Sequence, residues 1–199
     1  MKALMTAASA AVVAVALPGL ASAQTAPTTG VYANLGYANV HISGNDLVSS
    51  QDLGAIAGRL GYRFNNWLGV EGELAGGVKS DNFSTTINGA SVTGKTKLDH
   101  AEAIYGVGFL PVSPQWDLLA RIGYGHSEGK VEDVTVAGVS GTVSGLSGSA
   151  KGDSWNYGVG AQWHWDGANG IRGDYTRQEF TQGGNGHADV LSIAFDHRF

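Results

Sequence analysis

The sequence predicts an all-β fold, an eight-stranded antiparallel up-and-down transmembrane β-barrel, on the basis of three observations. Beyond residue 23 the chain repeats segments of about ten residues in which apolar and polar side chains alternate. Turn-rich gaps separate the segments, and short gaps alternate with mostly longer ones. Aromatic residues gather beside the short gaps. Successive side chains of a β-strand point to opposite faces, so alternation with a period of two indicates a strand whose two faces have different surroundings. The repeats therefore predict a sheet.

The first element is a targeting segment rather than part of the barrel. It has a basic Lys2, a short apolar run broken by Pro18-Gly19, and an A-x-A pattern that ends at Ala23. We therefore expect a cleaved signal peptide over residues 1–23 and a transmembrane β-barrel domain over residues 24–199. An uncleaved membrane anchor is the alternative, and the shortness of the run argues against it. The chain has no Cys, which excludes an acylated N-terminal cysteine and disulfides.

The strands follow in order, each bounded by Gly, Asn, Asp, Ser or Pro. The eight alternating segments are residues 30–42, 53–64, 67–78, 97–110, 116–127, 154–165, 170–180 and 188–199. The gaps at 65–66, 111–115 and 166–170 predict tight turns, and those at 44–51, 79–96, 128–153 and 181–187 predict loops at the opposite end. Short turns at one end and longer loops at the other are typical of a membrane barrel.

Each strand has an apolar face, which we expect to point outward. In chain order its members are Val31, Ala33, Leu35, Tyr37, Ile56, Leu60, Tyr62, Phe64, Leu68, Val70, Leu74, Ala101, Ala103, Tyr105, Val107, Phe109, Leu118, Ala120, Ile122, Tyr124, Trp155, Tyr157, Val159, Trp163 and Trp165. The opposite face is rich in Gly and charge. Its five arginines and six acids, together with His100 and His164, predict a polar network in the interior: Arg59, Arg63, Glu71, Glu73, Glu102, Asp117, Arg121, Arg172, Asp174, Asp196 and Arg198.

Alternation alone does not distinguish a membrane barrel from a soluble lipocalin-like barrel, whose apolar face points inward. Three features favour the membrane: aromatic residues at the short-turn rim, Gly beside long charged residues on the polar face, and a near balance of charges on that face. In a membrane, turning Arg59 and Arg121 toward lipid would cost about 4–8 kcal/mol, comparable to the stability of a domain. The charged face is therefore expected to point inward, with its charges paired.

The ordered motifs "GVEGEL", "YGVGF", "ARIGYG", "YGVGAQW" and "IRGDYT", followed by a terminal Phe199, resemble the small outer-membrane β-barrel proteins of Gram-negative bacteria. This opacity-type or porin-family group is close in architecture to the OmpX and OmpA transmembrane barrels. The resemblance covers about residues 28–199. It implies a location in the outer membrane, contact with its lipid, and assembly by periplasmic chaperones and the barrel-assembly machinery, with Phe199 as assembly signal. His197 departs from the more apolar residue usual at that place.

The resemblance implies a structural, surface-interaction or adhesion role, with host or cell-surface ligands bound by extracellular loops and no cofactor. A narrow channel for small solutes is the alternative, and a soluble secreted binding barrel is a third possibility. The formal charge of −5 gives no indication of a nucleic-acid partner. The run "GHSEG" (126–128 at its centre) has the residue types of a hydrolase, but adjacent strand residues point to opposite faces, so we expect no enzyme. The six His show no metal spacing on one element.

The loop over residues 129–153 is the longest of the gaps and alternates Val with small or polar residues. This pattern predicts either a hairpin that extends the fifth and sixth strands, turning near Ala137-Gly138 or Ser140-Gly141, or an irregular Gly/Ser loop.

Overall fold

The computed structural model describes residues 29–43, 50–87, 90–136, 148–181 and 186–199, so the predicted signal peptide at 1–23 lies outside the described residues. In these ranges no helix is long and apolar enough to cross a membrane. The same ranges hold nine strands: β1 (Gly30–Ile42), β2 (Gln51–Arg63), β3 (Leu68–Lys79), β4 (Asp81–Ile87), β5 (Ala90–Pro111), β6 (Trp116–Val136), β7 (Gly148–His164), β8 (Asn169–Phe180) and β9 (His187–Arg198).

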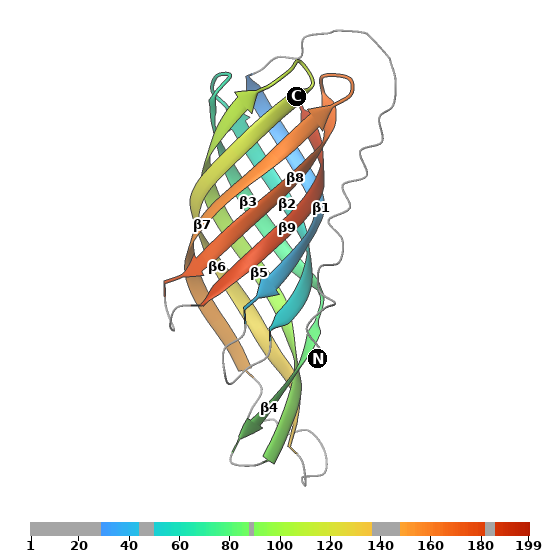
Figure 1. Cartoon of the computed structure of the whole chain (residues 1–199), viewed down its shortest axis with the longest axis vertical. Coiled ribbons are helices and arrows are strands. Elements are labelled where there is room, and N and C mark those ends of the chain that lie inside the picture. Colours follow the sequence, from blue (N-terminus) through green and yellow to red (C-terminus); the bar gives the residue numbers. More distant parts are fainter. Residues whose placement is uncertain (1–28, 44–49, 88–89, 137–147, 182–185) are drawn as a thin grey trace, which may run out of the picture.

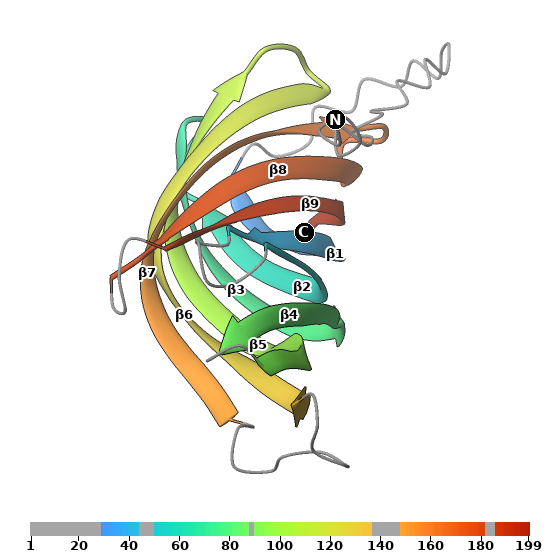
Figure 2. The ribbon, with the colours of Figure 1, turned by 60° about the horizontal axis from the view of Figure 1, so that its bottom comes forward.

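Eight of these strands close into an antiparallel ring. Each pairs with its neighbour along the chain, β3 pairs with β5, and β9 pairs with β1 (Figures 1 and 2). The register followed round the ring from Tyr32 passes Gly61, Glu71, Tyr105, Gly123, Asn156, Gln178 and Ala188 and returns to β1 at Ile42. This stagger of ten residues (42 − 32) gives the strands the tilt that a small barrel requires. The predicted fold class is confirmed.

The ninth strand is a difference from the sequence-based expectation. The gap at 79–96 was predicted as a loop, but it holds β4 and the first residues of β5, paired from Asp81↔Thr96 to Ile87↔Ala90. The β-branched residues of "FSTTI" and "ASVT" favour a strand over a loop. Together with the end of β6, which pairs with β5 as far as Val92↔Val136, these segments form a three-stranded extension. We call β4, residues 90–98 and residues 129–136 the outer arm; it projects at the end opposite the carboxyl end of β9 (Figure 1).

The hairpin predicted between the fifth and sixth barrel strands agrees with the described part of the loop. β6 and β7 stay paired as far as Val131↔Gly148, well beyond residue 127, where the sequence pattern ended the strand. The turns predicted at Ala137-Gly138 or Ser140-Gly141 lie outside the described residues.

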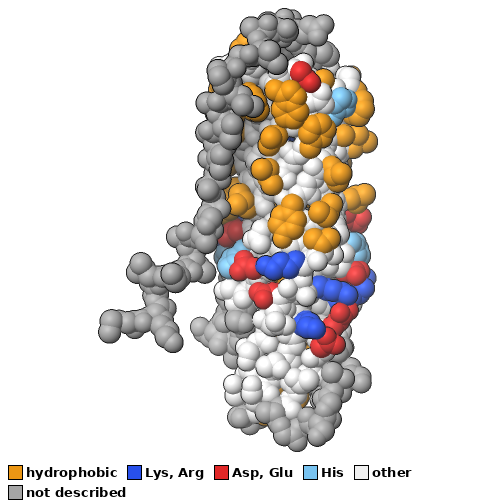
Figure 3. Space-filling view, turned by 90° about the vertical axis from the view of Figure 1, so that its right-hand side faces the viewer, with side chains coloured by type: hydrophobic (Ala, Val, Ile, Leu, Met, Phe, Trp, Pro, Cys, Tyr) orange, Lys and Arg blue, Asp and Glu red, His pale blue; other side chains and the backbone are white. Residues whose placement is uncertain are grey.

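The outer wall carries an apolar band followed by a belt of charge (Figure 3). In the band, large apolar side chains stand exposed, Leu35 at 64% and Ile193 at 61% among them, as lipid-facing residues do. At the short-turn rim aromatic rings touch in sequence, from Trp116 to the half-buried Trp163 to Trp165 to Phe195. Beyond the band, toward the outer arm, lies a belt of charge (Figure 3). The strand register places its residues beside one another, and we call them the charged belt: His41, Asp52, His100, Glu102, His126, Glu128, Lys151, Asp153, Arg177, Glu179, His187 and Asp189.

The two faces of β5 point the opposite way to the prediction: the face expected to meet lipid points into the ring. Tyr105, Val107 and Phe109 were expected to face lipid, but they are buried inside the ring at 4% exposure or less. The alternate residues, Ile104 and the glycines at 106 and 108, face outward instead. Phe109 therefore does not belong to the aromatic girdle. In "YGVGF" the residues that alternate with the apolar ones are both Gly, so this stretch has no charged residue to indicate which face points inward.

The arrangement of the strands makes the membrane orientation testable. We expect an epitope tag inserted at Gly141, in the chain between β6 and β7, to be reached by antibody on intact cells. A tag at Asn65, in the turn between β2 and β3, should react only after the outer membrane is opened, because the two positions follow strand ends at opposite ends of the ring. Antibody labelling of intact and permeabilised cells makes the measurement. Exposure of the Asn65 tag on intact cells would invert the proposed topology.

Candidate functional site

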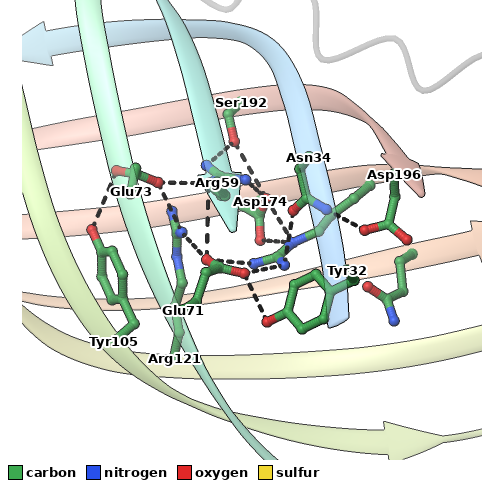
Figure 4. A network of polar contacts seen from close by, with 12 residues as sticks. Tyr32, Asn34, Arg59, Glu71, Glu73, Tyr105, Arg121, Asp174, Ser192 and Asp196 are labelled. Carbon is green, nitrogen blue, oxygen red and sulfur yellow. Dashed lines mark hydrogen bonds and ion pairs between the residues drawn. The ribbon is translucent and has the colours of Figure 1, made fainter. Parts of the chain in front are cut away.

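A polar network that includes Arg59, Glu71 and Asp174 lies at the middle of the ring (Figure 4). It is centred on Arg172 of β8, which has no exposed surface. Its Nη1 donates to Glu71 Oε2 at 2.6 Å, and its Nε donates to Asp174 Oδ1 at 2.9 Å. Nη1 also donates to the amide oxygen of Asn34 at 3.2 Å. The guanidinium thus joins β1, β3 and β8 across the interior, which fixes its orientation.

Two further arginines extend the same network toward the outer arm. Arg59 Nε donates to Glu73 at 2.6 Å, and its Nη1 donates to Asp174 at 2.7 Å. Arg121 donates to Glu71 at 3.2 Å and to Glu73 at 3.1 Å. Each carboxylate in this cluster therefore accepts from two or more arginines, because a charge buried away from water needs charged partners.

A second polar layer closes the short-turn end. Asp117 accepts from Arg63 at 2.9 Å, from Arg198 at 2.7 Å and from the Gln162 amide at 2.8 Å. The Arg63 guanidinium also lies over the ring of Phe109, 4.2 Å from its centroid. These contacts link β2, β5, β6, β7 and β9 at the level of the aromatic girdle.

His164 and Asp196 form a separate buried pair in this end of the barrel. The imidazole Nε2 lies 2.5 Å from Asp196 Oδ2, and the other carboxylate oxygen accepts a hydrogen bond from the side-chain amide of Asn34. His164 therefore faces inward, as the alternation of β7 predicts. The sequence offered no signal that its partner would be Asp196, because the two residues meet only through the register of three strands, in which Gly170 of β8 lies between them.

Of the five arginines and six acids predicted to face the interior, Glu102 is the one that the structure places elsewhere. Its side chain is exposed on the outer face of β5, in the charged belt, and His100 is exposed there as well. Both predictions are wrong for the same reason, the reversed orientation of β5. The ten remaining residues are all brought into the interior, where five arginines face five acids: Arg59, Arg63, Arg121, Arg172 and Arg198 with Glu71, Glu73, Asp117, Asp174 and Asp196.

Two buried tyrosines belong to this network although the alternation did not identify them. Tyr32 donates to Glu71 at 3.1 Å, and Tyr105 accepts from the Asn156 amide at 3.1 Å. Each ring lies over a glycine directly opposite it on the next strand, Gly61 for Tyr32 and Gly123 for Tyr105. A Cβ at either glycine would meet ring carbons at 2.6 Å, too close for any side chain. The pairs "inward Tyr opposite Gly" are the signal that could have found them.

Toward the outer arm the interior becomes apolar. Ala38, Val40, Leu53, Ala55, Ala57, Leu98, Ala188 and Val190 pack into one buried cluster, with Ile42, Ala75, Ala101 and Phe180 against it. A second buried cluster, of Tyr32, Tyr105, Val107, Phe109 and Leu119, lies among the polar layers. Side chains therefore fill the interior of the described ring as they do in narrow barrels.

The residues of the "GHSEG" run bind to different partners. His126 Nδ1 lies 2.7 Å from Asp153 Oδ1, whereas the Ser127 hydroxyl donates to the carbonyl oxygen of Gly152. A hydrolase would need the hydroxyl beside the imidazole. The arrangement instead adds His126 to a set of belt histidines that each lie beside an Asp, which includes His41 with Asp52 at 2.9 Å.

The tight turns are built by side chains that cap the backbone. Asp166 Oδ1 accepts the N–H groups of Ala168 and Asn169, and its Oδ2 accepts the side-chain amide of Asn169. These hydrogen bonds, the Asn169 amide first, hold the pKa of Asp166 below its usual range. Asn65 accepts in the same way from Trp67 and Leu68. Such Asx turns explain why only short gaps are needed at this rim.

Phe199 follows β9 directly and stands exposed at the short-turn rim. Its backbone N–H donates to Val31 at 3.0 Å, and its ring meets His197 edge-on at a centroid distance of 4.6 Å. His197 in turn hydrogen-bonds Asn169 at 2.8 Å, which accounts for an imidazole near the end of an otherwise apolar face. The role of Phe199 as an assembly signal stays a prediction.

A family model described as "Outer membrane protein beta-barrel domain" matches residues 7–199. No curated protein matches the chain in sequence. Among solved structures, Neisserial surface protein A has 11% identity and a TM-score of 0.59, with 85% of this chain and 97% of that chain covered. OprG of Pseudomonas aeruginosa has 12% identity and a TM-score of 0.56, with 88% and 98% covered.

The attachment invasion locus protein Ail of Yersinia pestis, solved in complex with the heparin analogue sucrose octasulfate, has 20% identity and a TM-score of 0.54, with 86% and 99% covered. At such identities these likenesses establish the fold alone. The resemblance to small Gram-negative outer-membrane barrels is confirmed by the family match, and outer-membrane lipid is the environment that such a family implies for the apolar band. The chain belongs to the outer membrane protein β-barrel domain family.

Proposed function

We propose that this protein is a closed, non-enzymatic outer-membrane barrel that makes surface contacts through its outer arm. The observation that carries the proposal is the combination of a filled interior with a sheet that continues beyond the apolar band. A filled interior leaves no open path for a solute. The projecting sheet offers a surface that a ligand can reach from outside the barrel.

The interior contacts support a closed lumen. Arg59 of β2 and Arg121 of β6, whose strands lie on either side of β3, both pair with the same β3 carboxylate, Glu73, and the apolar cluster lies beyond them. Opening a path would require these buried pairs to separate, and breaking one buried pair costs about 3–5 kcal/mol. This is why the narrow channel, the alternative from the sequence, is less favoured.

The outer arm has the properties of a contact surface. Its two outer pairs, Lys95 with Asp133 at 2.9 Å and Lys97 with Glu132 at 2.8 Å, hold β5 against β6. A hollow of about 510 Å³ lies on the arm between Phe83, Gly94 and Lys95. Sucrose octasulfate is named as the ligand of the Ail structure, so sulfated polysaccharides of host cells are a reasonable first class of ligand to examine, alongside other cell-surface ligands.

Shortening the arm tests the proposal. Replacing residues 82–95 by Asn-Gly retains the Asp81↔Thr96 pair and all eight strands of the ring. We expect cells that display this variant to adhere to host-cell monolayers no better than cells with an empty vector. The matched control replaces Asn65-Asn66 by Asp-Gly in a turn at the other end, and it should adhere like the wild type. Heat-modifiable gel migration checks that both proteins are folded. Equal adherence of the arm-shortened variant and the wild type would then refute an arm-mediated contact.

A further inference from the structure

A group of potential metal ligands lies on the outer wall where β5 and β6 leave the apolar band. The ligand atoms of Asp99, His100 and Glu128 all lie within 4.8 Å of one another. Adjacent strand residues normally point to opposite faces, so Asp99 and His100 would not be expected to converge.

A β-bulge brings them together. The register passes from Leu98↔Gly129 directly to His100↔Glu128, which leaves Asp99 as the extra residue of β5. An extra residue bends the strand and redirects its side chain. Asp99 Oδ2 comes to lie 3.3 Å from His100 Nδ1, and His100 stands directly across from Glu128.

This separation suits a shared cation. Two ligands of one tetrahedral zinc ion, each at ~2.0–2.1 Å from the metal, lie roughly 3.3 Å apart. One imidazole and two carboxylates are ligands that zinc accepts, and three protein ligands leave the fourth position open. The second oxygens of both carboxylates are already held, Asp99 Oδ1 by Lys130 at 2.6 Å and Glu128 Oε2 by Lys151 at 3.1 Å. Hydrogen bonds of this kind orient ligating carboxylates.

The surroundings favour a cation despite these lysines. Residues 95–102, 126–133 and 148–153, which form this part of the wall, carry six acids and four lysines. Among the described residues no other trio of His, Cys, Asp and Glu ligand atoms converges as closely. The neighbouring pair on the same two strands, Glu102 opposite His126, is the nearest alternative.

We propose that Asp99, His100 and Glu128 form a surface site for a divalent transition cation, with zinc as its best match. The site lies beside the charged belt, to which His100 and Glu128 belong. It does not involve the filled interior and is independent of the proposed adhesion.

Calorimetric titration of zinc chloride into the purified barrel in detergent micelles tests this site. We expect one zinc ion per barrel, with affinity reduced at least tenfold in both H100A and E128Q. Cobalt(II) should give the intense visible absorption of a tetrahedral site in the wild type and lose it in H100A. All three side chains are at least partly exposed, so the variants should remain folded. His41→Ala is the matched control, because His41 also lies in the belt beside an Asp but outside any such trio of described residues, and it should bind zinc like the wild type.

Two results would overturn the proposal. One is the absence of zinc uptake by the folded wild-type barrel. The other is uptake that persists in an H100A/E128Q double variant and disappears in an E102Q/H126A double variant, which would assign the metal to the neighbouring pair.

Discussion

Arg172→Ala is expected to lower the free energy of unfolding of the barrel by about 3–5 kcal/mol, the cost of leaving buried charges without their partner. Arg172 is fully buried and donates to both Glu71 and Asp174, so each carboxylate would lose one of its guanidinium partners. Urea-induced unfolding of the barrel refolded in detergent or lipid, followed by tryptophan fluorescence, measures the change.

The matched control for Arg172→Ala is Lys95→Ala in the outer arm. Lys95 also makes a short contact to an acid, Asp133 at 2.9 Å, but both side chains are more than half exposed. Exposed pairs contribute little because water and salt screen them, so the unfolding midpoint should not change measurably. Equal unfolding midpoints for Arg172→Ala and Lys95→Ala would contradict the assignment of Arg172 to a buried, paired interior.

Leu35→Arg is expected to destabilise the barrel by about 2–4 kcal/mol, since it places a charge in the hydrocarbon region. Leu35 lies on the outer face of β1, 64% exposed, between neighbours Phe195 and Gly58. The same unfolding measurement in lipid vesicles checks the value. The substitution removes no interior contact, so the effect reports on the surroundings of the outer face.

Asn39→Arg provides the control on the same strand and face. Asn39 lies four residues nearer the outer arm, where the charged belt begins, and there an arginine should cost only ~0–1 kcal/mol. Equal destabilisation by the two substitutions would mean that the apolar band does not face lipid as described.

Much of this architecture follows from side-chain alternation, because most strands carry a charge that fixes which face is which. Arg59 on β2, Glu71 on β3, Arg121 on β6 and Arg172 on β8 each determine the phase of their strand. A one-residue error would turn such a charge into lipid at a cost of about 2–4 kcal/mol.

The errors occur where that constraint is missing. In β5 the charges nearest the barrel are His100 and Glu102, and they lie at the level of the belt, where water can reach them. A charged residue at that level can face outward at little cost, so it does not indicate which face of the strand points into the ring. The bulge at Asp99 then shifts the alternation of the two faces by one residue. Tyr105 was predicted to face lipid because its ring is hydrophobic, which ignores that the Tyr105 hydroxyl has a buried partner in Asn156.

The outer arm was underestimated for a different reason. Gly and Ser in "NGASVTGK" favour a loop, while the strand depends on pairing with β4 and β6, which single-segment patterns do not contain. The partners inside the ring could not be read from the sequence either. Arg59 and Asp174 meet across 115 residues of chain, and only the stagger of the closed ring brings them together.

Single-channel recording in planar lipid bilayers tests the central claim, a lumen closed by its own side chains. We expect purified, folded protein to give near-zero conductance, because Arg59 and Arg121 bridge to Glu71 and Glu73 across the ring and the apolar cluster fills the space beyond them. Regular, reproducible conductance steps from the folded barrel would contradict the account and favour the narrow channel.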